Sequence, residues 1–143
     1  MIEGIRHTGI VVRNLDKMKN FYESLGFEEV SRNTETGDFI EKVTGINKVR
    51  VPWVKLRDIN GHLIELLFYE NNSKSKKVVN SDSNNLGISH IAFTVKDIKN
   101  TIEKIISLGG NVINPPAISE DGKVKVSYCH DIEGVLMEIV EVL

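Results

Sequence analysis

HTGIVVRNLDKMKNFYESLGF, residues 7–27, returns later in the chain as HIAFTVKDIKNTIEKIISLGG, residues 90–110. The two stretches align without a gap, with a histidine at the head of each and Ser-Leu-Gly near the end. A second matching pair follows, DINGHLIELL at 58–67 and DIEGVLMEIV at 131–140. An internal repeat of this length is a repeat of structure. The chain is therefore predicted to contain two copies of one module.

The spacing between the two matching blocks differs between the copies. The first copy is longer by ten residues, and the insertion is expected within TETGDFIEKVTGINK, residues 34–48, which has no clear partner in the second copy. Residues 71–85, NNSKSKKVVNSDSNN, consist mostly of Asn, Ser and Lys, a composition typical of a linker. We predict one domain over residues 1–143, made of module one at 1–70, a linker at 71–86 and module two at 87–143.

In each copy the spacing of the hydrophobic residues is first typical of a strand, then of a helix, and then of strands again. Runs rich in β-branched residues at 5–12 and 88–95 have the length of strands. Apolar residues then recur at three- and four-residue steps, which predicts an amphipathic helix with Asn14 or Asp97 as its N-cap and a glycine at its end. The remaining strand-length runs are 28–32, 49–56, 62–69, 111–113, 124–129 and 135–142. The predicted fold class is α+β, with two βαβββ modules that form a cup-shaped sheet.

Composition excludes several classes of protein. The chain has 143 residues, of which 41% are hydrophobic and 27% charged, as in an ordinary soluble domain. The formal charge of −2 argues against nucleic acid as a partner, and no apolar run approaches the length of a signal peptide or membrane span. With Cys129 as its single cysteine, the chain forms no internal disulfide. These features predict a cytoplasmic protein that does not act at membranes.

Four polar residues fall on strand faces that are otherwise largely apolar. They are His7 and His90 in the first strands of the two copies, and Glu65 and Glu138 in the last strands. Alone, such a histidine is more often a hydrogen-bonded core residue and such a glutamate more often a solvated one. Two matched pairs at repeat positions call for a shared cause, and a divalent metal held by two imidazoles and two carboxylates supplies it. By contrast, His62 and His130 have no histidine at the equivalent repeat position, and we expect both at the surface or in loops.

The repeated motifs resemble the vicinal oxygen chelate (VOC) superfamily, which includes glyoxalase I, methylmalonyl-CoA epimerase, extradiol dioxygenases and the fosfomycin and bleomycin resistance proteins. The resemblance covers nearly the whole chain. It implies paired βαβββ modules, a metal in the cleft and chemistry on substrates with neighbouring oxygens. Carried over residue by residue, it implies that the metal ligands are His7, Glu65, His90 and Glu138.

The ligand set narrows the resemblance to one branch. A His/Glu/His/Glu set resembles bacterial glyoxalase I, a lactoylglutathione lyase, whereas methylmalonyl-CoA epimerases typically have Gln in place of Glu65. The resemblance to extradiol dioxygenases and fosfomycin thiol transferases is weaker, because those branches hold their metal with three protein ligands. Bleomycin-binding members lack the metal ligands. The chain departs from glyoxalase I after His7, because the strand has no arginine there to pair with the glutathione carboxylate.

A further group of residues is predicted near the substrate. Residues 38–56 resemble glyoxalase-like VOC proteins that carry a TG motif followed by a strand lining the cleft. There Phe39 and Trp53 could form an apolar lid or pocket wall, with Ile40 and Val51, or could simply belong to the core. Tyr69 and Tyr128 complete the predicted pocket.

These observations predict a metal-dependent lyase or isomerase of the glyoxalase type. Its reaction would be proton transfer next to a carbonyl through a metal-stabilised enediolate, with Glu138 as the base and Glu65 as the acid/base on the opposite face. The alternatives are an epimerase resembling methylmalonyl-CoA epimerase and a non-catalytic small-molecule-binding protein of the resistance type. One divalent ion per site, Ni, Co, Zn, Mn or Mg, a small-molecule substrate and a homodimer are expected. The sequence selects neither the metal nor the substrate, nor does it say whether modules pair within one chain or between two.

Overall fold

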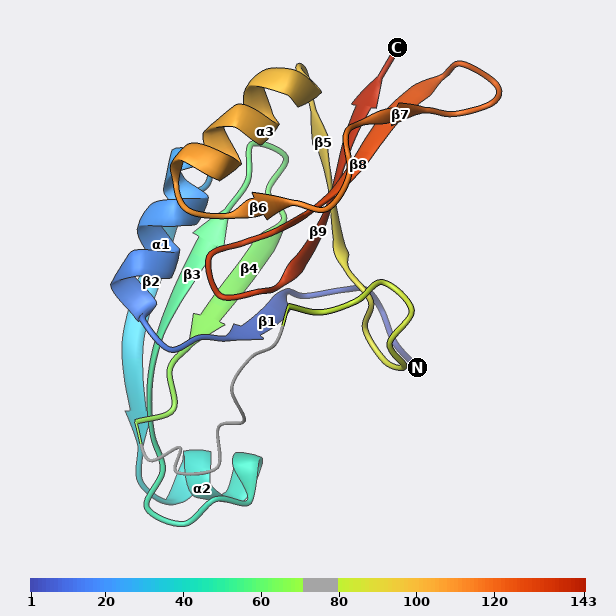
Figure 1. Cartoon of the computed structure of the whole chain (residues 1–143). Coiled ribbons are helices and arrows are strands. Elements are labelled where there is room, and N and C mark those ends of the chain that lie inside the picture. Colours follow the sequence, from blue (N-terminus) through green and yellow to red (C-terminus); the bar gives the residue numbers. More distant parts are fainter. Residues whose placement is uncertain (71–79) are drawn as a thin grey trace. The chain divides into compact units, whose positions relative to one another are not determined.

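The computed structural model describes residues 1–70 and 80–143 (Figure 1). The chain divides into two compact units, Met1–Ser75 and Lys76–Leu143, and each forms its own sheet. None of the helices in the described ranges is long and apolar enough to cross a membrane. Residues 71–79 of the predicted linker lie outside the described residues.

The first unit is a four-stranded sheet with one long helix packed on it. Its sheet order is β1-β4-β3-β2, with β1 parallel to β4 and the other pairs antiparallel. Helix α1 contacts β2, β3 and β4. The elements are β1 Thr8–Val11, α1 Leu15–Ser24, β2 Glu28–Thr36, α2 Asp38–Thr44, β3 Arg50–Arg57 and β4 Leu63–Leu67.

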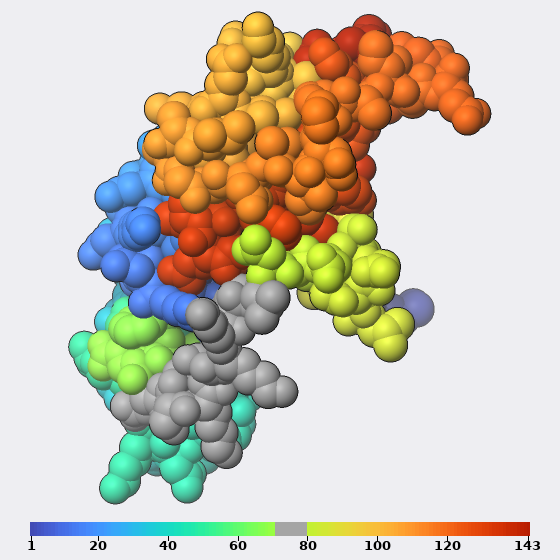
Figure 2. All heavy atoms as spheres, viewed as in Figure 1, coloured from blue at the N-terminus to red at the C-terminus, as the bar shows by residue number. Residues whose placement is uncertain are grey.

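The second unit repeats this topology. Its strand order is β5-β9-β8-β6, again with the first strand parallel to the last, and the short β7 adds to β8. The β7–β8 hairpin projects from this unit (Figures 1 and 2). The elements are β5 Ile91–Val95, α3 Ile98–Ser107, β6 Asn111–Val112, β7 Ala117–Ile118, β8 Val124–His130 and β9 Leu136–Val142. The predicted α+β class and the two βαβββ modules are confirmed.

The two long helices begin and end as their sequences predict. The side chain of Asn14 accepts a hydrogen bond from the backbone N–H of Lys17, and Asp97 accepts one from Asn100, each at 2.9 Å. Just beyond the helices, Gly26 and Gly109 have φ values of +104° and +96°, which a residue with a side chain rarely adopts. The apolar stripes are buried against the sheets through Met18, Phe21, Tyr22, Ile98, Ile102 and Ile105.

Equivalent aspartates shape the turn before the last strand of each module. Oδ1 of Asp58 accepts hydrogen bonds from the backbone N–H groups of Asn60 and His62, at 2.9 and 2.8 Å. Burial acts to raise the pKa of Asp58, but these donors hold it below its usual value. Oδ1 of Asp131 accepts from Glu133 and Val135 in the same way, both at 2.9 Å. The repeated Asp-Ile-x-Gly motif is therefore a structural turn.

Asp131→Ala should destabilise the fold more than Asp58→Ala. Asp131 is only 3% exposed, so its removal leaves two backbone donors without an acceptor in a buried turn, at a cost of about 1–3 kcal/mol. The side chain of Asp58 is 29% exposed, and water can replace it. Urea unfolding of both variants measures the difference. Equal losses of unfolding free energy would contradict this account of the turn.

His130 is buried, and the prediction that it lies at the surface or in a loop is wrong. It is the last residue of β8 and is 5% exposed. Its Nδ1 lies 2.9 Å from Oδ1 of Asn111, and its Nε2 lies 2.9 Å from the carbonyl oxygen of Ser81. The Ser81 N–H donates in turn to the carbonyl of Gly134 at 3.2 Å. His130 thus fixes the chain just before module two onto the module's own sheet, while His62 is exposed as predicted.

Cys129 should be unreactive in the folded protein. The residue is 0% exposed in β8, and burial raises the pKa of its thiol by disfavouring the thiolate. A disulfide reagent at pH 8 should modify it on the order of 100-fold more slowly in native than in urea-unfolded protein. The release of the chromogenic thiol measures both rates. Similar rates would mean that β8 opens readily.

Candidate metal and active site

The first unit brings His7 and Glu65 together. His7 immediately precedes β1, whose Gly9 is in register with Glu65 on the parallel strand β4. This register places Nε2 of His7 2.9 Å from Oε2 of Glu65. The Glu65 side chain is only 12% exposed. A carboxylate so deeply buried requires partners, and the His7 imidazole lies within hydrogen-bonding distance of it.

The second unit repeats this pair in the same geometry. His90 immediately precedes β5, whose Ala92 is in register with Glu138 on β9. Nε2 of His90 lies 3.1 Å from Oε2 of Glu138, and the two side chains are 28% and 25% exposed. In both modules, therefore, the second residue after the histidine pairs with the glutamate. The prediction that these positions are equivalent in structure agrees with the strand register.

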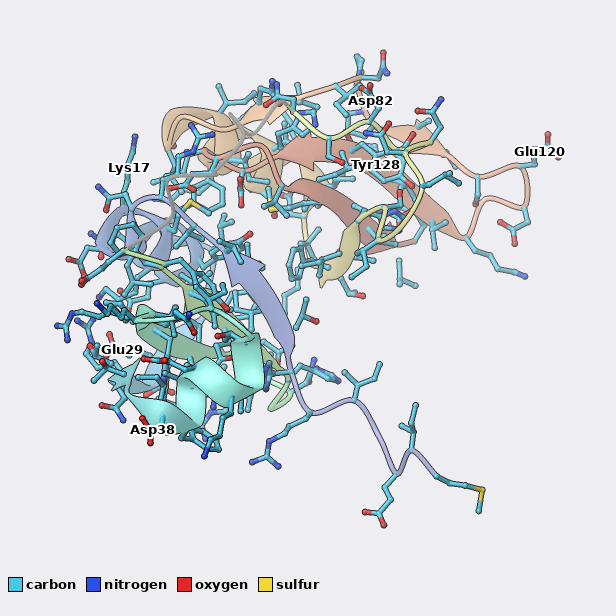
Figure 3. All side chains as sticks on the ribbon, turned by 90° about the horizontal axis from the view of Figure 1, so that it is seen from below. Lys17, Glu29, Asp38, Asp82, Glu120 and Tyr128 are labelled. Atoms are coloured by element: carbon cyan, nitrogen blue, oxygen red, sulfur yellow. The ribbon has the colours of Figure 1, made fainter. Side chains whose placement is uncertain are left out.

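On the strand next to each glutamate, the residue in register with it differs between the two modules. In the first, Lys55 on β3 is in register with Glu65, and its Nζ lies 3.3 Å from Oε1 of Glu65. In the second, Tyr128, which is labelled in Figure 3, lies on β8. It is in register with Glu138, and its hydroxyl lies 3.4 Å from Nδ1 of His90. The Tyr128 and His90 rings meet edge to face at 5.2 Å. No motif in the sequence distinguishes Lys55, although it occupies the repeat position of Tyr128.

The second ring nitrogens of the two histidines differ in their surroundings. Nδ1 of His90 has the Ser89 hydroxyl at 3.1 Å as well as the more distant Tyr128 hydroxyl. Nδ1 of His7 is buried and has no hydrogen-bond partner within the described residues. Outer partners of this kind fix the tautomer and orientation of a ligating imidazole. The second module therefore holds its histidine more firmly than the first.

The donor atoms of both pairs fit a divalent metal ion. Imidazole nitrogen and carboxylate oxygen are ordinary ligands for zinc, nickel, cobalt and manganese, and the two donor atoms lie 2.9 Å apart in the first pair and 3.1 Å apart in the second. Among residues 1–70 and 80–143, no group of three or more His, Cys, Asp or Glu side chains forms a metal site. Each unit thus offers two donors, which is half of the predicted ligand set.

The predicted pocket residues have varied surroundings. Trp53 is half-buried, and its Nε1 donates to Glu35 at 3.4 Å. It borders a hollow that Leu15, Arg32 and Pro52 also line. Tyr69, just beyond β4, is half-buried as well.

The segment from residue 38 to residue 51 divides between surface and core. Val51 is 1% exposed and belongs to the core, whereas Phe39, in α2, is 71% exposed. Val51 is therefore a core residue, whereas Phe39 is not.

Comparison with known proteins agrees with this architecture. A sequence model described as "Glyoxalase/Bleomycin resistance protein/Dioxygenase superfamily" matches residues 4–139. A probable lactoylglutathione lyase of Synechocystis is 28% identical over 137 residues, which cover 94% of this chain and 92% of that protein.

Solved structures share the fold over the full length of the chain. A glyoxalase family protein from Bacillus cereus superposes with a TM-score of 0.91 at 24% identity, covering 100% of this chain and 96% of the other. The fosfomycin resistance protein FosX from Listeria monocytogenes, in complex with Mn(II) and 1S,2S-dihydroxypropylphosphonic acid, gives a TM-score of 0.66 at 20% identity. That match covers 97% of this chain and 90% of FosX.

Proposed function

Because the chain belongs to the Glyoxalase/Bleomycin resistance protein/Dioxygenase superfamily, we propose that it is a metal-dependent lyase or isomerase of the glyoxalase type. The reaction is proton transfer at a carbon next to a carbonyl of a small molecule. The observation that carries the proposal is the recurrence of one His–Glu pair, at 2.9 and 3.1 Å, in equivalent positions of both modules. The resemblance to a probable lactoylglutathione lyase supports the reaction class.

The four paired residues are proposed to hold one divalent ion, Ni, Co, Zn, Mn or Mg. His7 and Glu65 supply two donors from the first module, and His90 and Glu138 supply two from the second. When bound, such an ion acts as a Lewis acid toward the substrate oxygens and stabilises negative charge that develops on them. The Mn(II) in the FosX structure supports a divalent ion in this fold.

Glu138 is proposed as the base that removes the proton. Its side chain is about twice as exposed as that of Glu65, at 25% against 12%. Within the described chain, no lysine or arginine forms an ion pair with Glu138, whereas Lys55 contacts Glu65. A carboxylate that is less constrained can reach a substrate proton more readily. Glu65, proposed on the opposite face of the planar intermediate, can return the proton.

The protein is proposed to be a cytoplasmic homodimer. Each module supplies half of the ligand set, so a module of the other kind, from the same chain or from a second copy, has to complete the site. Each open sheet also leaves edges that a partner could cover. Sedimentation equilibrium at micromolar concentration should give twice the chain mass of 16.1 kDa. A monomer would contradict the proposed dimer. The two modules would then have to pair within one chain.

Metal analysis combined with proton exchange tests the proposed function. Protein purified without added metal is analysed by mass spectrometry and then loaded with each candidate ion. Deuterium incorporation from heavy water is followed by NMR in hemithioacetals of methylglyoxal with several thiols, and in 2-hydroxy and 2-oxo thioesters. We expect about one ion per site and exchange that requires it.

The other outcomes separate the alternatives. Deuterium exchange in an acyl thioester with inversion of configuration at the exchanging carbon would favour the epimerase. Ferrous iron with oxygen uptake would indicate a dioxygenase. Metal-loaded protein that exchanges no candidate proton would contradict the catalytic assignment and favour a small-molecule-binding protein.

A further inference from the structure

Lys55 lies beside the candidate ligand Glu65 on the same face of the first sheet. The two residues are in register on β3 and β4, and Nζ of Lys55 lies 3.3 Å from Oε1 of Glu65. The ammonium group also lies over the Trp53 ring, 4.6 Å from its centroid. The lysine side chain is only 25% exposed. A lysine held on two sides in this way has lost the freedom that surface lysines usually keep.

The two oxygens of Glu65 are divided between two partners. Oε2 faces His7 and Oε1 faces Lys55. A carboxylate oxygen that ligates a metal ion has less electron density to offer an ammonium group, so metal binding weakens the Lys55 pair. A partly buried ammonium group whose ion pair is weakened is less well compensated for its lost hydration. Lys55 therefore favours a new anion at this position once Glu65 is engaged.

The charges of the site lead to the same conclusion. In the proposed four-ligand site, the two glutamates would balance the charge of a divalent ion, so Lys55 would add one positive charge on the side of the first module. The equivalent position in the second module carries Tyr128, which is uncharged in its phenol form. The excess charge therefore belongs to the first module. A substrate with one negative group placed near β3 would neutralise it.

We propose that Lys55 binds a carboxylate of the substrate, and that the substrate is a small hydroxy or oxo acid. This inference rests on the proposed function, whose substrate class it specifies. The Trp53 ring forms the apolar wall beside the carboxylate, and the ammonium group supplies a charge-assisted hydrogen bond. Lys55 thus determines specificity, whereas the glutamates move the proton.

A matched pair of small probes tests the proposal. Lactate and lactamide have nearly the same shape and differ in charge, and their binding to manganese-loaded protein is measured by calorimetry. Wild-type protein should prefer lactate. Lys55→Met should reduce that preference by about 10- to 100-fold, the range expected for a hydrogen bond between charged groups. The affinity for lactamide should stay within about twofold, because this probe makes no ion pair.

Two further variants separate charge from structure. Lys55→Arg keeps the positive charge and should retain most of the preference for lactate. Lys19→Met is the matched control, because Lys19 is similarly covered, at 19% exposure, and is ion-paired to Glu23 at 2.9 Å on α1. It should bind both probes as the wild type does. Circular dichroism and metal content are measured for each variant.

Several results would overturn the role of Lys55. These are an unchanged preference in Lys55→Met, a wild-type protein that binds lactate no better than lactamide, and loss of metal from Lys55→Met. In the last case Lys55 would act through Glu65 instead of through the substrate. Deuterium exchange separates this failure from failure of the proposed function. If the protein exchanges substrate protons but shows no preference for lactate over lactamide, the role of Lys55 is rejected and the proposed function stands. If it prefers lactate but exchanges no proton, the catalytic role is rejected and the role of Lys55 stands.

Discussion

Glu138→Gln should lower the rate of proton exchange at the substrate carbon by ~10²–10⁴-fold, the range typical of a lost general base. Glutamine keeps the shape of the side chain and one oxygen that can ligate weakly, so the fold should persist. The measurement is deuterium incorporation by NMR, with metal content determined for each sample. Glu65→Gln should have a smaller effect if the site is epimerase-like, because the resemblance to methylmalonyl-CoA epimerases implies that Gln is tolerated at this position.

Glu141→Gln provides the matched control for Glu138. Glu141 lies on the same strand, β9, but its carboxylate accepts a hydrogen bond from the backbone N–H of Ile98 at 2.8 Å, at the start of α3. The same chemical change there should leave exchange unaltered. If Glu138→Gln exchanged protons as fast as this control, Glu138 would have no part in the mechanism.

The combined substitution His7→Ala/His90→Ala should abolish stoichiometric metal binding. Each imidazole nitrogen lies about 3 Å from its paired carboxylate, and each pair would be reduced to a single donor. Either substitution alone should weaken affinity by more than the ~10–100-fold associated with an outer-shell partner. Equilibrium dialysis with metal analysis measures the effect.

His62→Ala serves as the control for the histidine variants. The His62 side chain is 81% exposed and is paired with Asp58 in the turn before β4, so its loss should not alter metal affinity. His130 is unsuitable, because its substitution would disturb a buried hydrogen-bond network. A double variant that binds metal as tightly as His62→Ala would refute the proposed ligand set.

The sequence was sufficient to predict the two modules and the equivalence of His7 with His90 and of Glu65 with Glu138. Two independent signals agreed, the repeat and the alternation of side chains along a strand. The repeat does not say that the first strand of each module pairs with the last. That register, which brings each histidine to its glutamate, is visible only in the structure. Convergence of the two pairs on one ion stays a prediction, since it depends on how modules associate.

Other features required information that the sequence lacks. Helix α2, within the predicted insertion, is 7 residues long and buries none of them, so its sequence is too short to establish a helical period. A lysine in a strand, such as Lys55, is normally a surface residue, and only the register shows that it lies beside Glu65. His130 was misassigned because β8 extends one residue further than predicted and places the imidazole inward.

The pairing of the first strand of each sheet with its last has a consequence for synthesis on the ribosome. Thr8 pairs with Ile64, and Ile91 pairs with Met137, so neither sheet can close until its final strand has emerged. Contacts so distant along the chain form slowly and leave apolar strands exposed meanwhile. Module one can nevertheless close while module two is still being translated. Slowing translation between the two modules should therefore reduce aggregation of the nascent chain, whereas slowing it before β4 should increase aggregation.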